Sequence, residues 1–168
     1  MREQVEAVSI REYRSDDRDR VLVLLYMLHG SYKDTVVPQE LRQFGENRDL
    51  VTAYSEYMDI VGRSHGDQYM TFVAEDGFGQ MVGAIIGSVE HDQWDVLTPV
   101  GLVEDWFVTV EHRGTGIGST LYRKLEEWFR SNGCRQVRSD TWIANQLSRD
   151  VHAALGFVEY GVDLRKRL

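Results

Sequence analysis

The stretch that decides the fold is Gly101–Asn132, GLVEDWFVTVEHRGTGIGSTLYRKLEEWFRSN. Its first part is apolar and predicts a strand, and its last part carries apolar side chains at spacings of three and four, which predicts a helix from about Gly116. Between them Gly114, Gly116 and Gly118 allow unusual backbone angles and a close approach of a ligand. Because the first N–H groups and the positive dipole end of the helix meet there, the turn predicts a phosphate site.

Two common glycine motifs do not fit this turn. A phosphate loop of the GxxxxGK[ST] kind is absent, because no Lys directly follows any of these glycines. A dinucleotide fingerprint needs Gly where Ser119 stands, and it normally opens a βαβ unit, whereas antiparallel-looking strands precede this turn. A plain glycine-rich turn without a ligand is the other alternative.

The turn and its flanks resemble the R-G-x-G-x-G/A signature of the GNAT superfamily of acyl-CoA-dependent N-acetyltransferases. In that superfamily the signature follows a strand that ends in V-x-x-E-x-R, and Val108–Arg113 reads VTVEHR. The resemblance implies that acetyl-CoA binds at the strand end and the turn, with its pyrophosphate on the backbone amides. The cofactor-binding residues that it implies are Phe107, Val108, Val110, Arg113, Gly114, Thr115, Gly116, Ile117, Gly118, Ser119 and Asn145.

Composition favours one compact cytoplasmic domain over residues 1–168. The chain has 42% hydrophobic residues and two prolines, which suits a single core. No apolar run reaches the length of a membrane span, and the N-terminal residues lack the apolar core of a signal peptide, so we expect no membrane partner. The single Cys134 excludes an internal disulfide and a cysteine-based metal site, and the histidines show no metal-ligand spacing, so no metal is expected.

Charge is divided along the chain. The net charge is −8, and the 49 residues from Ser64 to His112 hold nine acidic and no basic side chains, whereas ten Lys and Arg stand against six acids from Arg113 onward. This division suits an anionic cofactor on one side and a cationic substrate on the other, although a solvated acidic face gives the same pattern. We expect no nucleic acid partner, because phosphate backbones bind to basic surfaces.

The rest of the chain predicts alternating strands and helices. In order, the expected elements are a strand at 8–13, a helix at 17–29 stopped by Gly30, a helix from Pro38 to Gly62 with a weak point at Gly45, strands at 69–75, 80–91 and 101–110, the helix after the glycine turn, a strand at 136–141, a helix at 145–155 and a strand at 158–164. This order predicts an α/β (α+β) domain with a mixed, mainly antiparallel sheet of about six or seven strands and four flanking helices, as in the GNAT fold.

Acetyl transfer to an amine needs a base, because alkylammonium groups titrate near ~10.4 and are charged at neutral pH. Sequences that resemble the aminoglycoside 6'-N-acetyltransferases carry a Glu in an L-E-G-x-Y-V pattern, which reads VEDWFV here and places Glu104 at that position. Asp105 stands where the pattern has Gly. Since neighbouring side chains of a regular strand face opposite sides, we expect only one acid to face the acceptor, Glu104 first and Asp105 in reserve. An exposed strand acid without a role is the alternative.

His152 stands where many family members have the Tyr that protonates the leaving thiolate. The aminoglycoside branch often reads S-x-x-V-H-x-x-L-G-F there, after an S-D-x-x-x-x-N segment, and this chain has SRDVHAALGF after SDTWIAN. The resemblance implies His152 as the acid, and a helix-end His favoured by the dipole is the alternative. It also implies that Asn145, if not only a helix N-cap, binds the pantetheine arm, and that a backbone N–H near Val108, at a β-bulge, holds the oxyanion.

These features predict an acetyl-CoA-dependent N-acetyltransferase whose partner is a small-molecule amine. The acidic stretch favours a cationic acceptor, aminoglycoside-like or polyamine-like. A homodimer is compatible with the resemblance. The alternatives are a non-catalytic acyl-CoA-binding module, since a fold does not fix an activity, and an acetyltransferase of a protein or peptide amine.

Overall fold

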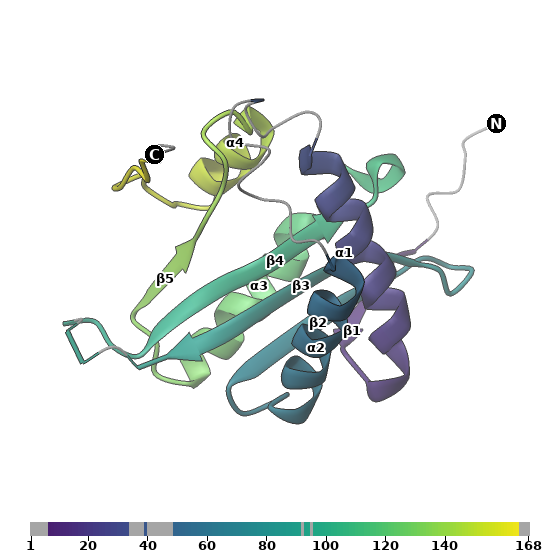
Figure 1. Ribbon diagram of the computed structural model, residues 1–168, viewed down its shortest axis with the longest axis horizontal. Coiled ribbons are helices and arrows are strands. Elements are labelled where there is room, and N and C mark those ends of the chain that lie inside the picture. Colours follow the sequence, from purple (N-terminus) through teal and green to yellow (C-terminus); the bar gives the residue numbers. More distant parts are fainter. Residues whose placement is uncertain (1–6, 34–38, 40–48, 92, 95, 165–168) are drawn as a thin grey trace.

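The computed structural model describes residues 7–33, 39, 49–91, 93–94 and 96–164. At its centre is a five-stranded sheet in the order β1-β2-β3-β4-β5. The strands are β1 (Ser9–Glu12), β2 (Tyr69–Glu75), β3 (Met81–Glu90), β4 (Val100–Val108) and β5 (Gln136–Ser139) (Figure 1). Neighbours are antiparallel except for the parallel pair β4–β5. The mixed, mainly antiparallel sheet is therefore confirmed.

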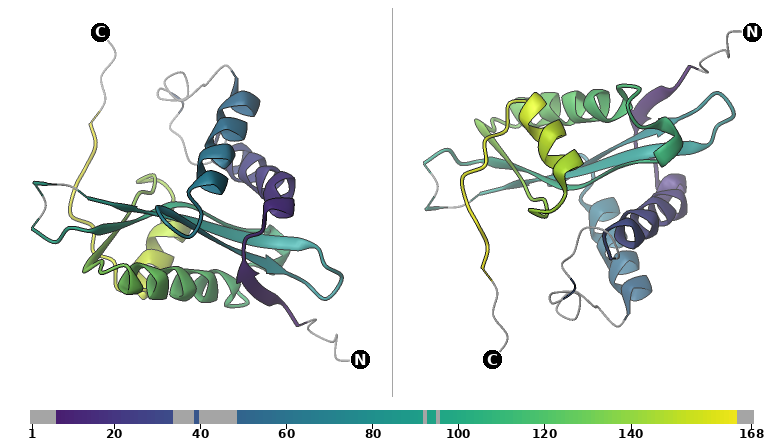
Figure 2. Two further views of the ribbon diagram at one scale, coloured as in Figure 1. Left: turned by 90° about the horizontal axis from the view of Figure 1, so that it is seen from below. Right: turned by 90° about the horizontal axis from the view of Figure 1, so that it is seen from above.

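Four α-helices in the described residues cover the two faces of the sheet. The helices α1 (Arg18–Lys33) and α2 (Leu50–Arg63) lie on one face, and α3 (Ile117–Ser131) and α4 (Gln146–Ala154) lie on the other (Figure 2). The short 3-10 helices η1 (Ser15–Asp17) and η3 (Val110–His112) precede α1 and the glycine turn. Each face of the sheet has its own hydrophobic core, so the predicted class and the four flanking helices are confirmed.

Two glycines let α3 pack closely on the sheet. A Cβ at Gly87 of β3 would lie 2.7 Å from Phe129 Cζ, and a Cβ at Gly101 of β4 would lie 2.6 Å from Phe129 Cγ. The Phe129 ring is 1% exposed and fills the space above both strands. A larger side chain at either position would push α3 away from the sheet, which explains glycine inside these strands.

Two helix predictions need comment. The prediction that Gly30 stops the first helix was wrong, because α1 continues to Lys33. A glycine inside a helix costs only about 1 kcal/mol relative to alanine, and the packing of the apolar face of α1 outweighs it. The predicted end of the second helix near Gly62 is confirmed at Arg63, whereas Pro38 and Gly45 lie outside the described residues.

The predicted last strand does not form in the described residues. Residues 158–164 follow α4 without strand structure and run away from the body of the protein (Figure 2). Their alternating apolar side chains are exposed: Val158 83%, Tyr160 88%, Val162 76% and Leu164 87%. Alternation marks a sequence able to pair, but a strand also needs a neighbouring strand, and β5 pairs with β4 alone. The sheet therefore has five strands instead of six or seven.

An ion-pair cluster ties β1 to β2 and to the start of α1. Arg11 donates to both oxygens of Asp17, at 2.6 and 2.8 Å, and to both oxygens of Glu75, each at 2.9 Å. Arg20 adds a bond of 2.8 Å to Glu75. Hydrogen bonding to Arg11 is the main cause that lowers the pKa of both carboxyls. Since Asp17 is only 1% exposed, its charge depends on this partner.

Replacing Arg11 by Met should lower the free energy of unfolding by about 3 kcal/mol at neutral pH, because the buried Asp17 carboxylate loses its bidentate partner. Carboxyls with a lowered folded pKa stabilise the fold above their ordinary pKa, and this stability is lost as the pH falls through the folded value. The difference between variant and native protein in urea unfolding should therefore shrink below about pH 4.

Arg130→Met is the control for this variant. The Arg130 side chain is 71% exposed and pairs with Glu126 one turn away on α3, so its loss should cost at most about 0.5 kcal/mol. Equal losses in the two variants would show that the buried cluster contributes no more than a surface pair.

Candidate active site

The glycine turn joins η3 to α3 through two residues in left-handed conformation. Gly114 has φ 75° and Gly116 has φ 87°, and Gly116 is the N-cap of α3. A Cβ built at either glycine meets no atom within 4 Å. The turn therefore needs glycine for its backbone angles and leaves open space in front of the main chain.

The backbone amides of the turn are available as donors. In the described part of the chain, the N–H groups of residues 114–119 donate no hydrogen bond to another protein group. Hydroxyls hold the turn instead: Thr115 Oγ1 donates to the His112 carbonyl at 2.6 Å, and Thr120 Oγ1 donates to the Gly116 carbonyl at 2.9 Å. This arrangement gives an anion a row of free N–H groups at the positive end of α3.

Some side chains around the turn are buried in the hydrophobic cores, and others are exposed at the surface. Arg113 bends back onto β4, where its Nε donates to the Val108 carbonyl at 3.1 Å and its guanidinium lies 5.7 Å from the centre of the Phe107 ring. Phe107 and Ile117 are 6% and 7% exposed and belong to the cores, and Val110 is 64% exposed. Among the expected cofactor residues, the turn thus offers its backbone, and Arg113 fastens the turn to the strand.

Strand β4 carries a β-bulge at Glu104. The register pairs Asp105 with Ile86 and Val103 with Gly87, so Glu104 has no partner on β3. The extra residue shifts the alternation, and Val103 packs with the core under α3 although the alternation from Phe107 would place it under α1 and α2. The bulge expected near Val108 therefore lies at Glu104 among the described residues.

Both acids of β4 face the α2 side of the sheet. The charges of Asp105 and Glu104 both raise the pKa of the Tyr57 phenol on α2, after burial, which is the main cause. Ser88 of β3 donates its hydroxyl hydrogen to the Glu104 carboxylate. The premise that the two acids face opposite sides of the sheet was wrong, because the strand is bulged at this point. Which of them meets the acceptor stays a prediction.

Asp105 is the more enclosed of the two acids. Burial raises the pKa of Asp105 to about 6, the Tyr57 hydroxyl lowers it in part, and the charge of Glu104 adds to the rise. The Tyr57 hydroxyl is itself buried, and no described residue is placed to form a hydrogen bond with it. A carboxyl that titrates near neutral pH can both take and release a proton, so Asp105 is suited to general base chemistry.

Asp105→Asn should stabilise the protein at pH 8. Burial favours the neutral form, so Asp105 adds stability below its ordinary pKa of 3.8, and this is lost as the pH rises through about 6. The neutral amide avoids that loss, and we expect a gain of about 1 to 3 kcal/mol in urea unfolding at pH 8 that disappears near pH 4. Glu104→Gln makes the same charge change at an exposed position, and because its charge is only the smallest cause of the raised pKa of Asp105, it should give a smaller gain at pH 8. A gain that is equal at both pH values would contradict the burial effect.

His152 lies beside the part of β4 that has no strand neighbour on the β5 side. The parallel pairing ends at Val103 and Ser139, and the two strands separate beyond this point (Figure 1). The Nε2 atom of His152 lies 2.8 Å from Ser139 Oγ, and its ring centre lies 5.5 Å from that of Trp106 on β4. Glu104 and Asp105, the expected bases, and His152, the expected acid, therefore lie around the same short segment of β4.

Three further residues near the site have contacts that bear on the sequence predictions. The Asn145 side chain accepts from the Ser148 amide at 3.2 Å, so Asn145 is the N-cap of α4, and its contact with the pantetheine arm stays a prediction. Ser139 and Tyr57 were not given a role, although they contact His152 and influence Asp105. No sequence signal separates Tyr57 from the other aromatic residues on the apolar face of α2, and Ser139 was visible only as part of the S-D-x-x-x-x-N segment.

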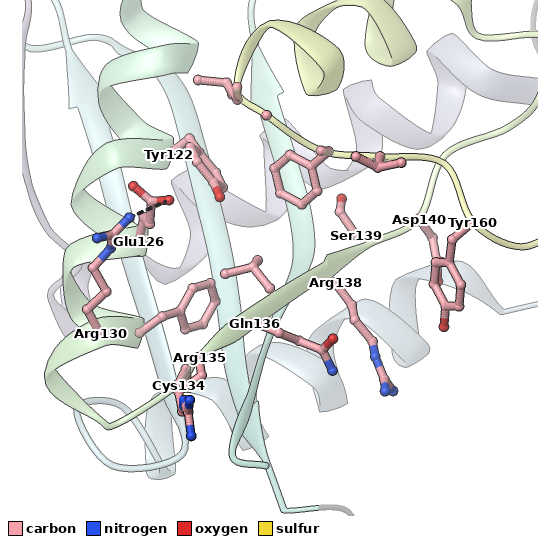
Figure 3. A pocket seen from close by; sticks show the side chains of 16 residues that line it. Tyr122, Glu126, Arg130, Cys134, Arg135, Gln136, Arg138, Ser139, Asp140 and Tyr160 are labelled. Carbon is pink, nitrogen blue, oxygen red and sulfur yellow. Dashed lines mark ion pairs between the residues drawn. The ribbon is translucent and has the colours of Figure 1, made fainter. Parts of the chain in front are cut away.

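A groove of about 660 Å³ lies between α3, β5 and the residues after α4 (Figure 3). Its lining includes the ion pair of Arg130 with Glu126, the side chain of Arg138 and, at the end of β5, Ser139. The acids of β4 and the glycine turn do not line it. This groove therefore follows β5 and is distinct from the space in front of the glycine turn.

The described residues contain no group of three or more His, Cys, Asp or Glu side chains that could hold a metal ion. Cys134 is buried beside the second core. In the same part of the chain, no helix combines the length and the apolar character that a membrane span requires.

Comparison with known proteins gives the family. The family model described as acetyltransferase (GNAT) family matches residues 35–157, which include the bulged strand, the glycine turn and α4. The chain belongs to the acetyltransferase (GNAT) family. The GNAT order of elements and the R-G-x-G-x-G signature at Arg113–Gly118 are therefore family features in this chain.

Several relatives of the chain share one name, aminoglycoside N(6')-acetyltransferase type 1. The chain is 32% identical over 90 residues to the aminoglycoside N(6')-acetyltransferase type 1 of Stenotrophomonas maltophilia, covering 52% of this chain and 59% of the relative. It is 34% identical over 95 residues to the protein of that name from Salmonella typhimurium, covering 55% and 65%. The chain thus matches about three fifths of the length of these relatives.

Solved structures show the same fold. The aminoglycoside acetyltransferase AAC(6')-Iy, in complex with the bisubstrate analogue CoA-S-monomethyl-acetylneamine, aligns with a TM-score of 0.72 at 24% identity, over 96% of this chain and 99% of that one. The 6'-N-acetyltransferase AAC(6')-Ih from Acinetobacter baumannii aligns with a TM-score of 0.70 at 22% identity, over 96% and 99%. At these identities the likeness establishes the fold of the chain and leaves its substrate to be argued from the site.

Proposed function

We propose that the protein is an acetyl-CoA-dependent N-acetyltransferase that acts on a primary amine of a cationic small molecule, an aminoglycoside first and a polyamine second. One observation carries the proposal: β4 holds two carboxyls at its bulge and leads through η3 into a turn with free amides at the N-terminus of α3. The names of the curated relatives and of AAC(6')-Iy support the choice of reaction and of acceptor.

The glycine turn fits the pyrophosphate of acetyl-CoA. Open space lies where a Cβ of Gly114 or Gly116 would stand, and the amides of residues 114–119 have no protein acceptor in the described part of the chain. The dipole of α3 adds a favourable potential for negative charge at this position. The backbone of residues 113–119 would hold the phosphates, and Arg113 would steady the turn from below.

The carboxyls at the bulge supply the base. Glu104 is exposed and is held by the Ser88 hydroxyl. We therefore assign to it the role of the general base that takes the proton from the acceptor ammonium group. Asp105, whose pKa is raised to about 6, is the reserve and keeps a negative charge beside Glu104 at neutral pH. The neutral amine can then attack the acetyl carbonyl carbon, which a charged ammonium cannot do.

The acceptor choice rests on part of the acidic stretch. Glu75 is neutralised by Arg11 and Arg20, so it does not attract a substrate. Glu104 and Glu90 act on one place, because their charges together raise the pKa of the Tyr69 phenol after burial, the main cause. Negative potential is therefore concentrated between β2, β3 and the bulge of β4, where a polycation would be held.

An acceptor panel at two salt concentrations tests this assignment. We expect thiol release from acetyl-CoA to be fastest with a kanamycin-type aminoglycoside, slower with spermidine and slowest with acidic amino acids. The rates with polycations at limiting concentration should fall as salt rises, because salt screens the attraction. Faster turnover of the acidic amino acids, or rates with polycations that do not change with salt, would show that the acidic surface has no part in binding.

The proposal includes a homodimer and a cytoplasmic location. The exposed apolar side chains of residues 158–164 support an assembly, because a monomer would leave this alternating segment in water. Light scattering on the purified protein should give twice the mass of one chain. A single-chain mass at micromolar concentration would contradict the dimer.

A further inference from the structure

Both ring nitrogens of His152 have partners. Nδ1 lies 2.7 Å from the backbone carbonyl oxygen of Ser148, and Nε2 lies 2.8 Å from Ser139 Oγ. The Ser148 hydroxyl oxygen lies farther from Nδ1, at 3.3 Å. Because the nearer carbonyl oxygen only accepts, we infer that the hydrogen of the neutral ring sits on Nδ1 and donates to that carbonyl. Nε2 of that ring has no hydrogen, and it accepts a hydrogen bond from the Ser139 hydroxyl.

Aromatic rings hold this imidazole in place. The ring centres of Trp106 and Phe157 lie 5.5 and 5.0 Å from that of His152, each at an interplanar angle of 70°. Tyr122 of α3 stacks on Trp106 and also contacts Phe157, which fixes this wall. A ring held by two hydrogen bonds and two aromatic contacts does not swing easily toward a substrate. When the ring is protonated, its Nε2 proton can leave along the hydrogen bond to Ser139 Oγ.

The acid and the base lie on opposite sides of the sheet. Ser139 is the last residue of β5 and pairs with Val103, the residue before the bulge at Glu104. Its hydroxyl points to His152 of α4, on the α3 side, whereas Glu104 and Asp105 face α2. A thioester that lies between the glycine turn and the bulge would pass the point where the β4–β5 pairing ends. The carboxylates of Glu104 and Asp105 would then lie on one side of the thioester, and the Ser139 hydroxyl would lie on the other.

We propose that Ser139 is a catalytic residue that hands a proton from His152 to the leaving sulfur; this rests on the acetyl transfer proposed above. When the carbon–sulfur bond breaks, its electron pair goes to sulfur, and sulfur takes the proton of the Ser139 hydroxyl. The Oγ atom takes the Nε2 proton of the imidazolium in the same step. The products are the acetylated amine, the free thiol, an intact Ser139 hydroxyl and a neutral His152 with hydrogen on Nδ1, the tautomer that the Ser148 carbonyl favours.

The relay makes turnover depend on the protonated imidazole, so the rate should fall at high pH. The elements packed against His152 carry several other titratable or charged groups. These are Glu104 and Asp105 on β4, Tyr122, Glu126 and Arg130 on α3, Arg138 on β5, Asp140 directly after it, Arg149 and Asp150 on α4, and Glu159 after Phe157. The Ser139 hydroxyl is the hydrogen-bond partner of Nε2 in the described part of the chain and stands at the end of the β4–β5 pairing, so its removal should act on the high-pH limb selectively.

Ser139→Thr and Ser139→Val form the matched test, because the two side chains have the same shape and differ in the hydroxyl. We expect Ser139→Val to lower kcat about 10²-fold and to remove the high-pH limb, with acetyl-CoA affinity by calorimetry within about twofold of the native value. Ser139→Thr should return kcat to within about fivefold of the native value and keep the limb. Circular dichroism checks the fold, and Ser139→Ala replaces the Val variant if the latter unfolds.

The outcomes separate the relay from the proposed function. Native protein without amine-dependent thiol release would overturn the proposed function and the relay together. An active native protein whose Ser139→Val variant keeps both kcat and the high-pH limb would overturn the relay alone. Equal losses in the Thr and Val variants would also overturn it, because shape and not the hydroxyl would then be responsible.

Discussion

Glu104→Gln is expected to lower kcat by about 10² to 10⁴-fold, the range that a positioned general base contributes. The amide keeps the size of the side chain and can still contact Ser88, but it cannot take a proton from the acceptor. The affinity for acetyl-CoA should stay unchanged, because the glycine turn lies beyond the C-terminal end of β4, whereas Glu104 lies in the middle of the strand. Steady-state rates over about pH 5 to 9 measure the effect and its low-pH limb.

Asp105→Asn is the companion variant, because the two acids share one side of the bulge. If Glu104 is the base, its substitution removes the low-pH limb, and the Asp105 variant keeps a limb with a reduced or shifted midpoint. A limb near pH 6 that persists in Glu104→Gln and disappears in Asp105→Asn would move the role to Asp105, whose pKa is raised to about 6.

Gly116→Val is expected to abolish the binding of acetyl-CoA in calorimetry, with an affinity at least about 100-fold weaker than the native one. The branched side chain would occupy the open space in front of the amides. It would also strain a backbone with φ 87°, which moves the N–H groups at the start of α3. Unchanged affinity would contradict the phosphate assignment.

Gly79→Val separates these two effects. Gly79 has φ 77° in the β2–β3 hairpin, and a Cβ there also meets nothing within 4 Å. The control therefore carries similar backbone strain outside the glycine turn, and it should lose stability while keeping its affinity for acetyl-CoA. Equal losses of affinity in both variants would assign the effect to general destabilisation.

Features that depend on a short stretch of chain could be predicted from the sequence. The glycine turn and α3 follow from the alternate glycines and from the spacing of Leu121, Leu125 and Phe129, and the structure has them as expected. The hairpin between β2 and β3 likewise follows from the glycines of its turn. These signals are local, so no knowledge of distant neighbours was needed.

Features that depend on pairing could not be predicted. The bulge at Glu104 is a property of the register between β3 and β4, and its position changes which way both acids face. The segment 158–164 has the alternation of a strand but lacks a strand partner in the described residues. The contact of Ser139 with His152 joins β5 to α4 across 13 positions, and neither residue type signals it.

The most direct test of acetyl transfer measures the free thiol released from acetyl-CoA by the purified protein, with and without an amine, alongside calorimetric binding of acetyl-CoA. We expect binding in the absence of amine and thiol release that requires both the protein and the amine, with one acetylated amine formed for each thiol. Tight binding without amine-dependent thiol release from any amine of the panel would contradict an enzyme and would identify a non-catalytic acyl-CoA-binding module.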